Sequence, residues 1–287
     1  MTTPRASEPT AASPEPAPQV PPIPPVPLGA GECFILTAAG FAVYQTVASA
    51  AWTLDRPVLG LTLGAIAGGI LPLAVLLWVR RLPLRRMLGE RPRWRDLGLA
   101  VWIVVSAMPL LYTMAGAVAQ VFPPSEAQLA LYRALVPGGW LDVGWGGLAV
   151  VVVAPLAEEI LFRGLLLRGT ASLMSVPIAV VCGGVLFGAS HGALWLVLPL
   201  AGLGVLLGWL VWRTRGLAAA WLGHALFNLV AYADLCITHD VRGARLEAWA
   251  TRPWVWIPAT AVMLWGLARL RRGLPDATDP GSSYLRD

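Results

Sequence analysis

The feature that most constrains this chain is a series of about eight long apolar segments, each able to cross a hydrocarbon core of ~30 Å as a helix. In lipid, every backbone N–H and C=O group must be bonded within its own segment, and the alternating pattern of a barrel strand is absent. The sequence therefore predicts an all-α fold, a polytopic bundle of transmembrane helices. The predicted spans are residues 33–54, 58–79, 97–121, 144–167, 176–191, 194–212, 217–237 and 254–270.

The composition agrees with lipid as the solvent. The 287 residues are 57% hydrophobic and 13% charged, whereas a soluble domain carries about 25% charged residues. Every basic residue is an arginine and most lie between apolar segments, so the net charge of +5 reflects membrane topology, and no nucleic-acid partner is expected. The spacing of the cysteines fits neither a zinc ribbon nor a redox pair. We expect them to be small buried hydrophobic residues: Cys33, Cys182 and Cys236.

The placement of arginine predicts how the helices are oriented. The loop at 80–95 is rich in arginine and is expected to be cytoplasmic. Alternation of the spans puts further arginines on the same side: Arg168, Arg213, Arg215, Arg269, Arg271 and Arg272. The loop at 238–252 is expected on the other side, although it carries Arg242, Arg245 and Arg252. We therefore expect an integral protein of the plasma (inner) membrane with both termini in the cytoplasm.

Five regions are expected along the chain. A Pro-rich tail at 1–30 and a second tail at 273–287 lack the composition for a packed core and are predicted to be disordered. Residues 31–143 hold the first spans and the arginine-rich loop, residues 144–237 hold a catalytic membrane core, and residues 238–272 hold an outer loop and the last span.

Two connecting segments carry signals of their own. Residues 82–96 mix Leu, Met and Trp with Arg, which is typical of an amphipathic segment at the cytoplasmic interface. Residues 125–135 are expected to form a short surface helix.

The fourth span contains the sequence AEEILFRG, which puts two adjacent carboxylates and a guanidinium into an otherwise apolar helix. Such groups cost ~2.5–3.5 kcal/mol each at the centre of a membrane helix, so they mark candidates for function. Glu159 and Arg163 are four residues apart and can pair on one helix face, whereas Glu158 is rotated by roughly 100° from Glu159. We expect Glu159 to be paired and structural and Glu158 to be free for general-base chemistry. The alternative is a cluster of interfacial charges, but Glu158 lies roughly 15 Å inside the cytoplasmic end.

Two histidines and an asparagine lie in later spans. The fifth span ends in FGASH, in which Phe187 is one turn before His191 and is expected to pack against it. The seventh span contains HALFN, in which His224 and Asn228 share a face and can hold a water, a metal or an oxyanion. Each piece alone has a structural alternative, an interfacial histidine or a polar clamp between helices. Together with Glu158 they form one candidate set.

The motifs EEILFR, FGASH and HALFN resemble, in order and spacing, the EExxxR, FxxxH and HxxxN pattern of the CPBP family. That family comprises CAAX prenyl endopeptidases of the Ras-converting type and bacteriocin-processing or self-immunity proteins, including the lysostaphin-resistance-protein-like group. The resemblance covers roughly residues 144–232, and the flanking spans match only in being apolar.

The resemblance implies an intramembrane endopeptidase. Glu158 would activate the attacking water with help from His191, and His224 and Asn228 would stabilise the tetrahedral oxyanion. The two remaining motif residues, Glu159 and Arg163, would shape the site. The chemistry is consistent on its own terms, because a peptide carbonyl needs an activated water and preorganised donors in a water-poor site. No serine elbow, cysteine nucleophile or HExxH motif appears in the spans.

Whether a metal takes part is left open by the residues. A base, a water partner and an oxyanion hole are present without one, so we expect that no cofactor is required. The alternative is Zn²⁺ held by Glu158, His191 and His224 with one open position.

The expected partners are the lipid bilayer and a membrane-associated peptide or protein substrate, including C-terminally lipidated ones of the CAAX type. The sequence names neither the substrate nor the oligomeric state. The alternative from another class is a non-catalytic membrane scaffold or bacteriocin self-immunity protein that uses the same polar cluster for packing or binding. A transporter is disfavoured because the two halves show no repeat.

Overall fold

The computed structural model describes residue 23, residues 26–241 and residues 248–272. Within them every element is helical, apart from an isolated bridge that pairs Gly89 with Gly216. The predicted all-α class is therefore confirmed.

The first half of the bundle consists of α1 (Ala30–Thr53), α2 (Pro57–Ala65), η1 (Ile66–Ile70), α3 (Leu71–Val79), α4 (Leu84–Leu88), α5 (Trp94–Val121) and α6 (Glu126–Arg133). The second half consists of α7 (Trp140–Gly147), η2 (Leu148–Val153), α8 (Ala154–Glu159), η3 (Ile160–Leu166), α9 (Leu167–Thr170), α10 (Val176–Ser190), α11 (Leu194–Thr214), α12 (Leu217–Thr238) and α14 (Pro253–Arg272). The segments labelled η are π-helical, with a wider turn than the α-helix.

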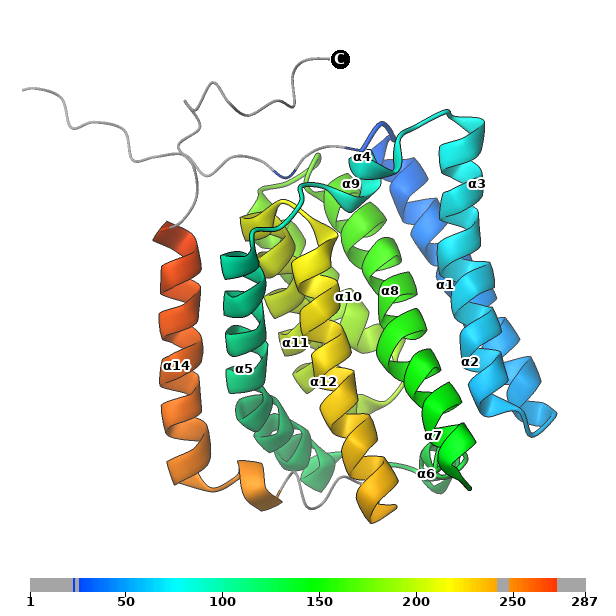
Figure 1. Cartoon of the computed structure of the whole chain (residues 1–287), viewed down its shortest axis with the longest axis vertical. Coiled ribbons are helices and arrows are strands. Elements are labelled where there is room, and N and C mark those ends of the chain that lie inside the picture. Colours follow the sequence, from blue (N-terminus) through cyan, green and yellow to red (C-terminus); the bar gives the residue numbers. More distant parts are fainter. Residues whose placement is uncertain (1–22, 24–25, 242–247, 273–287) are drawn as a thin grey trace, which may run out of the picture.

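Several elements join end to end into longer helices. α2, η1 and α3 form a helix over 57–79, and the elements from α7 to α9 form another over 140–170, here called the central helix. Among the described helices, five are long and apolar enough to cross a membrane: Ala30–Thr53, Pro57–Val79, Trp94–Val121, Leu194–Thr214 and Leu217–Thr238. The central helix, the shorter α10 and α14 lie alongside them (Figure 1). The number of eight membrane-spanning helices stays a prediction, whereas the described residues form a polytopic helix bundle.

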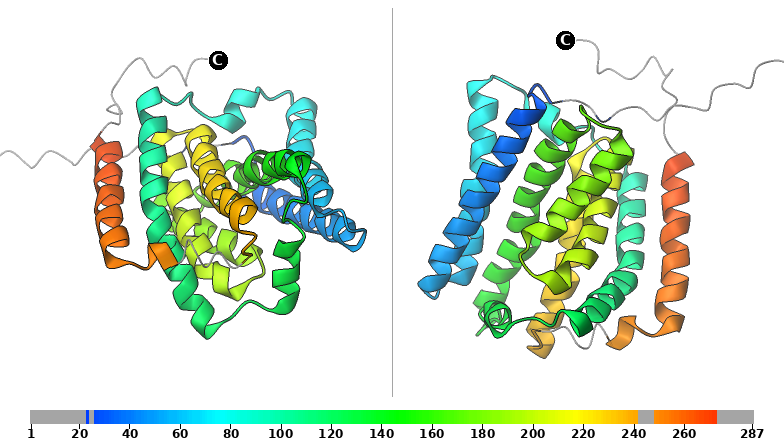
Figure 2. Two further views of the ribbon diagram at one scale, coloured as in Figure 1. Left: turned by 60° about the horizontal axis from the view of Figure 1, so that its bottom comes forward. Right: turned by 180° about the vertical axis from the view of Figure 1, so that it is seen from behind.

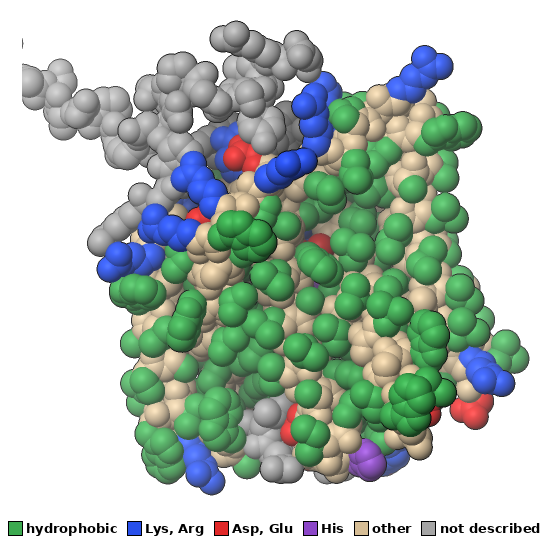
Figure 3. Space-filling model, viewed as in Figure 1, with side chains coloured by type: hydrophobic (Ala, Val, Ile, Leu, Met, Phe, Trp, Pro, Cys, Tyr) green, Lys and Arg blue, Asp and Glu red, His purple; other side chains and the backbone are tan. Residues whose placement is uncertain are grey.

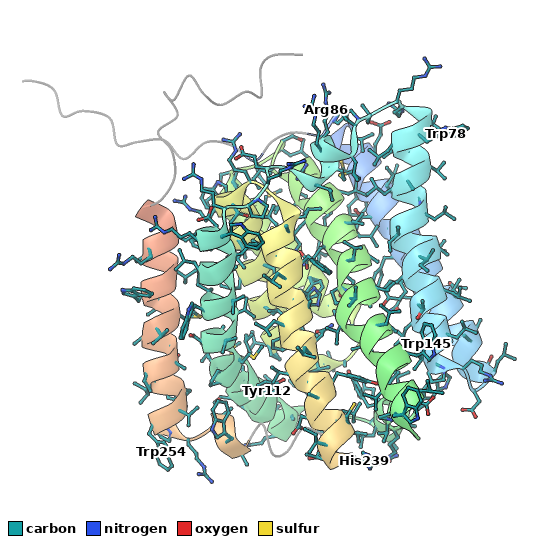
Figure 4. The ribbon with its side chains drawn as sticks, viewed as in Figure 1. Trp78, Arg86, Tyr112, Trp145, His239 and Trp254 are labelled. Carbon is teal, nitrogen blue, oxygen red and sulfur yellow. The ribbon has the colours of Figure 1, made fainter. Side chains whose placement is uncertain are left out.

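The two ends of the bundle differ in charge. At one end lie α4 and α9, and Figure 4 places Arg86 and Trp78 there. On the side seen in Figure 3, Arg side chains gather at this end, here called the Arg-rich face. At the other end, the opposite face, lie α6, the start of α7 and the labelled residue His239. α1 begins and α14 ends at the Arg-rich face, as both views in Figure 2 agree.

The centre of the bundle is a cluster of buried apolar side chains from α5, α11 and α12, including Ile103, Leu207 and Ala220. α10 and α11 pack so closely that a Cβ atom at Gly188 would overlap the carbonyl of Val197. The absence of a side chain at Gly188 therefore allows this close approach. Large apolar side chains such as Trp78 lie exposed on the outside, as expected for a protein whose outer surface meets lipid.

Most helix boundaries fall close to the predictions. The central helix begins at Trp140, a turn earlier than predicted, and α6 forms the predicted surface helix. A capping box explains where α6 starts, since the Ser125 hydroxyl accepts from the Gln128 N–H and the Gln128 side chain accepts from the Ser125 N–H.

Parts of the predicted tails, and Arg242 and Arg245, lie outside the described residues. Ile23 and Val26, which fall inside the predicted N-terminal tail, are buried against the bundle.

Candidate active site

The predicted ion pair on the central helix is present. Nη1 of Arg163 lies 2.7 Å from Oε1 of Glu159, and both side chains are almost fully buried. Nη2 of Arg163 also donates to the Gly204 carbonyl on α11, at 3.1 Å. The guanidinium is therefore held by two helices, and Glu159 has a cationic partner that offsets the cost of its burial.

His224 joins the same carboxylate from α12. Its Nδ1 atom lies 2.9 Å from Oε1 of Glu159, and because a carboxylate only accepts, Nδ1 carries the hydrogen. Nε2 is then directed at the second carboxylate, 3.7 Å from Oε2 of Glu158. The adjacent glutamates thus have different surroundings, since Glu159 is held by Arg163 and His224 while the Glu158 side chain is 13% exposed.

Phe187 fills the space between these groups. Its ring is fully buried, with the Arg163 guanidinium 4.4 Å above its centre. The ring centres of His191 and His224 lie 4.9 Å and 5.5 Å away, both in edge contacts. Phe162 packs on another edge at 5.2 Å. The predicted contact of Phe187 with His191 is confirmed, and the same ring also sets the position of His224.

Asn228 is oriented by the π-helical segment η2. Its Nδ2 atom donates to the Val150 carbonyl at 2.9 Å, and Nε1 of Trp221, two turns earlier on α12, donates to the Val152 carbonyl at 3.3 Å. Carbonyls are available here because the wider turn displaces the usual backbone bonding.

A proline explains why η2 widens at this point. Pro155 has no N–H to give to the carbonyl four residues earlier, and its ring crowds that carbonyl. Pro72 stands in the same relation to η1. The sequence analysis predicts none of the three π-helical segments, although a proline inside an apolar span is a signal for η1 and η2.

His191 ends α10. Its Nδ1 atom lies 2.8 Å from the Phe187 carbonyl, and because a carbonyl only accepts, Nδ1 carries the hydrogen. The residue is exposed. Among the interactions of the described residues, none joins His191 directly to Glu158.

One cavity of about 570 Å³ connects the candidate residues. Glu158, His191, His224 and Asn228 all line it, with walls formed mainly by apolar side chains of α5, α11 and α12. Four residues from three separate motifs therefore line one cavity, and their catalytic roles stay a prediction.

Tyr44 of α1 also lines this cavity and was missed by sequence reasoning. It is 4% exposed, and its hydroxyl interacts with the Glu158 carboxylate. A tyrosine within an apolar span was the available signal, because a buried phenol hydroxyl usually needs a polar partner.

The donor set does not form a metal site in this arrangement. Nowhere in the described part of the chain do three His, Cys, Asp or Glu side chains come together as a metal would require. Glu158, His191 and His224 share the cavity without converging on one point as three ligands.

Comparison with known protein families matched residues 140–230 to the family described as type II CAAX prenyl endopeptidase Rce1-like. The matched stretch contains every motif residue from Glu158 to Asn228. No curated protein and no solved structure matched the chain. The family and the long apolar helices agree on an integral membrane protein. The Rce1-like match over residues 140–230 supports the resemblance of this part of the chain to the CPBP family of CAAX-type proteases.

Proposed function

We propose that this chain is an intramembrane endopeptidase that cleaves membrane-associated proteins or peptides, with Glu158 as the general base. The proposal is supported by the different surroundings of the two glutamates. Glu159 is occupied by Arg163 and His224, whereas Glu158 borders the cavity together with His191 and Asn228.

In the first step, Glu158 takes a proton from a water while the water oxygen bonds to the peptide carbonyl carbon. The carbonyl π electrons move onto oxygen, which gives a tetrahedral oxyanion. His191 borders the same space and would hold the water by a hydrogen bond from or to Nε2.

The oxyanion needs donors fixed in advance. Asn228 has two amide hydrogens, of which one is held by Val150 and the other remains for the cavity. His224 supplies the second donor when it is protonated, since Nδ1–H is held by Glu159 and Nε2, 3.7 Å from the Glu158 carboxylate, lies at the cavity that both residues line.

A proton on His224 would also balance the charges of the cluster. The buried cluster contains the carboxylates of Glu158 and Glu159 and the guanidinium of Arg163, so one further positive charge makes it neutral. A buried uncompensated charge is costly. In the last step the oxyanion electrons re-form the carbonyl as the C–N bond breaks, and the leaving amine takes the proton held by Glu158.

The mechanism needs no metal. Its chemistry is supplied by a carboxylate base and two hydrogen-bond donors. If chelation abolished the activity of the purified protein and Zn²⁺ restored it, the proposal of a metal-free site would be overturned.

The test compares Glu158→Gln with the parent in detergent, using a mixed library of quenched fluorogenic peptides with apolar cores. We expect cleavage to fall by at least roughly 10²-fold, the lower range for loss of a general base. Glu32→Gln makes the same change at a glutamate in an exposed pair with Arg80 and is the matched control. If Glu158→Gln kept full activity or full biological effect, the scaffold or self-immunity alternative would replace the peptidase.

A further inference from the structure

Tyr44 approaches Glu158 from a helix outside the stretch that matches the family. It belongs to α1, which lies with α2 beside the central helix (Figure 1). The match begins at residue 140, so neither the three motifs nor the match accounts for a polar side chain from α1 at this place. The Tyr44 hydroxyl interacts with the Glu158 carboxylate, and both residues line the same cavity.

The ring of Tyr44 is held by close packing from two helices. The residue is 4% exposed and belongs to a buried cluster with Ala154 and Ala157, in the turn of the central helix directly before Glu158. On α2, a Cβ atom at Gly64 would lie only 2.8 Å from Cδ2 of Tyr44, so the missing side chain leaves room for the ring. These contacts are made by the ring, and they fix where the hydroxyl lies.

The chemistry of the two groups gives the contact a direction. An ionised carboxylate only accepts hydrogen bonds, whereas a phenol hydroxyl can donate. Tyr44 is therefore the donor when Glu158 is ionised, which is the form that acts as a base. The carboxylate then has the Tyr44 hydroxyl from α1 and Nε2 of His224 from α12, 3.7 Å from its Oε2 atom, as neighbours. Neighbours from two helices restrict a side chain that is otherwise rich in rotamers.

Packing alone does not require a phenol at position 44. Phe41, one turn earlier on α1, makes edge contacts with Tyr44 and Phe162 without a polar group. A buried hydroxyl is costly unless it has a partner, and the partner here is the candidate base. The hydroxyl is therefore the part of Tyr44 that packing does not explain.

We propose that Tyr44 is a positioning residue of the peptidase, whose hydroxyl holds the Glu158 carboxylate in the orientation that takes a proton from the attacking water. This rests on the proposed function of Glu158. Tyr44 acts through that carboxylate and touches no reacting atom, and no bond is made or broken at its oxygen. The working site thus extends to α1, beyond the residues that the family motifs supply.

The first test is Tyr44→Phe, which keeps the ring contacts and removes only the hydroxyl. Steady-state kinetics in detergent on one well-cleaved fluorogenic peptide separates kcat from KM. We expect kcat to fall about 10- to 10²-fold, the loss of one hydrogen bond to a charged group, with KM unchanged. The unfolding temperature should stay close to that of the parent. A parent-like kcat would overturn the proposal, while an inactive Glu158→Gln would leave the peptidase intact.

Thr37→Val is the matched control. Thr37 lies two turns before Tyr44 on α1, and its hydroxyl also reaches the central helix, donating to the Leu161 carbonyl at 3.1 Å. It is buried like Tyr44 but does not line the cavity. Thr37→Val should therefore lower the unfolding temperature and leave kcat unchanged. An equal fall in kcat for both variants would mean that any hydroxyl joining α1 to the central helix supports activity, which would overturn the specific role of Tyr44.

The second test asks whether the hydroxyl contacts substrate directly. Fluorescence anisotropy measures binding of the same peptide, carrying a fluorescent label, to Glu158→Gln and to the double variant Glu158→Gln, Tyr44→Phe, neither of which should cleave it. A residue that acts through Glu158 should leave Kd unchanged between the two. Weaker binding by the double variant would place the hydroxyl on the substrate and overturn the positioning role. Absence of cleavage by the parent itself would instead refute the peptidase.

Discussion

Nδ1 of His224 and Oε1 of Glu159 form a 2.9 Å hydrogen bond between residues 65 positions apart, joining α12 to the central helix inside the bundle. The same oxygen also lies 2.7 Å from Nη1 of Arg163. Glu159 therefore accepts hydrogen bonds from the Arg163 guanidinium on the central helix and from the His224 imidazole on α12.

Replacing Glu159 with Gln should destabilise the protein. The substitution keeps the shape but leaves the Arg163 guanidinium, 2% exposed, without an anionic partner. Breaking a buried pair in this way costs about 3–5 kcal/mol, and thermal unfolding in detergent should register the loss. Glu32→Gln breaks an exposed pair with Arg80 and should leave the unfolding temperature nearly unchanged, because exposed pairs contribute little to stability. Equal unfolding temperatures for the two variants would contradict the structural role of Glu159.

Replacing Asn228 with Ala should reduce kcat by roughly 10²–10³-fold with little change in KM, the signature of a lost oxyanion donor. Steady-state kinetics on one cleaved peptide measures both constants. The matched control is Trp221→Phe, which removes the other side-chain bond to η2 but does not reach the cavity. If Trp221→Phe lowered kcat as much, Asn228 would act through the helix contact and not through the substrate.

Replacing His191 with Ala should separate activity from stability. The imidazole is exposed and makes one hydrogen bond to its own helix, so unfolding should change little while cleavage falls roughly 10²–10⁴-fold. His239 is an exposed histidine at the opposite face that does not line the cavity, and His239→Ala should leave cleavage unchanged. A His191→Ala enzyme of normal activity would remove this residue from the water site.

Replacing Pro155 with Ala should impair the site without unfolding the bundle. The new N–H can restore an α-helical bond and narrow η2, which moves the Val150 carbonyl away from Asn228 and turns Glu158 relative to the cavity. A misplacement of about 1 Å can cost about 10²-fold in rate. Pro258→Ala, inside α14 and away from the cavity, is the control. Unchanged kcat in Pro155→Ala would mean that η2 does not position the site.

Local patterns in the sequence were sufficient for part of this structure. The apolar spans predicted the bundle because length and hydrophobicity act within each segment. The spacing of Glu159 and Arg163 predicted their pair because an α-helix repeats every 3.6 residues. It held even though the turn between them runs into η3.

Other features depend on contacts between distant segments. The bond from His224 to Glu159 and the approach of Tyr44 to Glu158 arise from how helices pack, which one sequence does not specify. The widening at η2 has a local cause in Pro155, but a proline in an apolar span can also produce a simple kink, so its effect does not follow from the sequence alone.

The shared oxygen of Glu159 also has an evolutionary consequence. A lineage that replaces Arg163 with an apolar residue leaves a buried carboxylate without its cation, and one that replaces Glu159 leaves a buried cation. Each single change is costly and the double change is much less so. We expect the two positions to covary among homologues, whereas Glu158, which borders the cavity, should change only where the chemistry itself is lost.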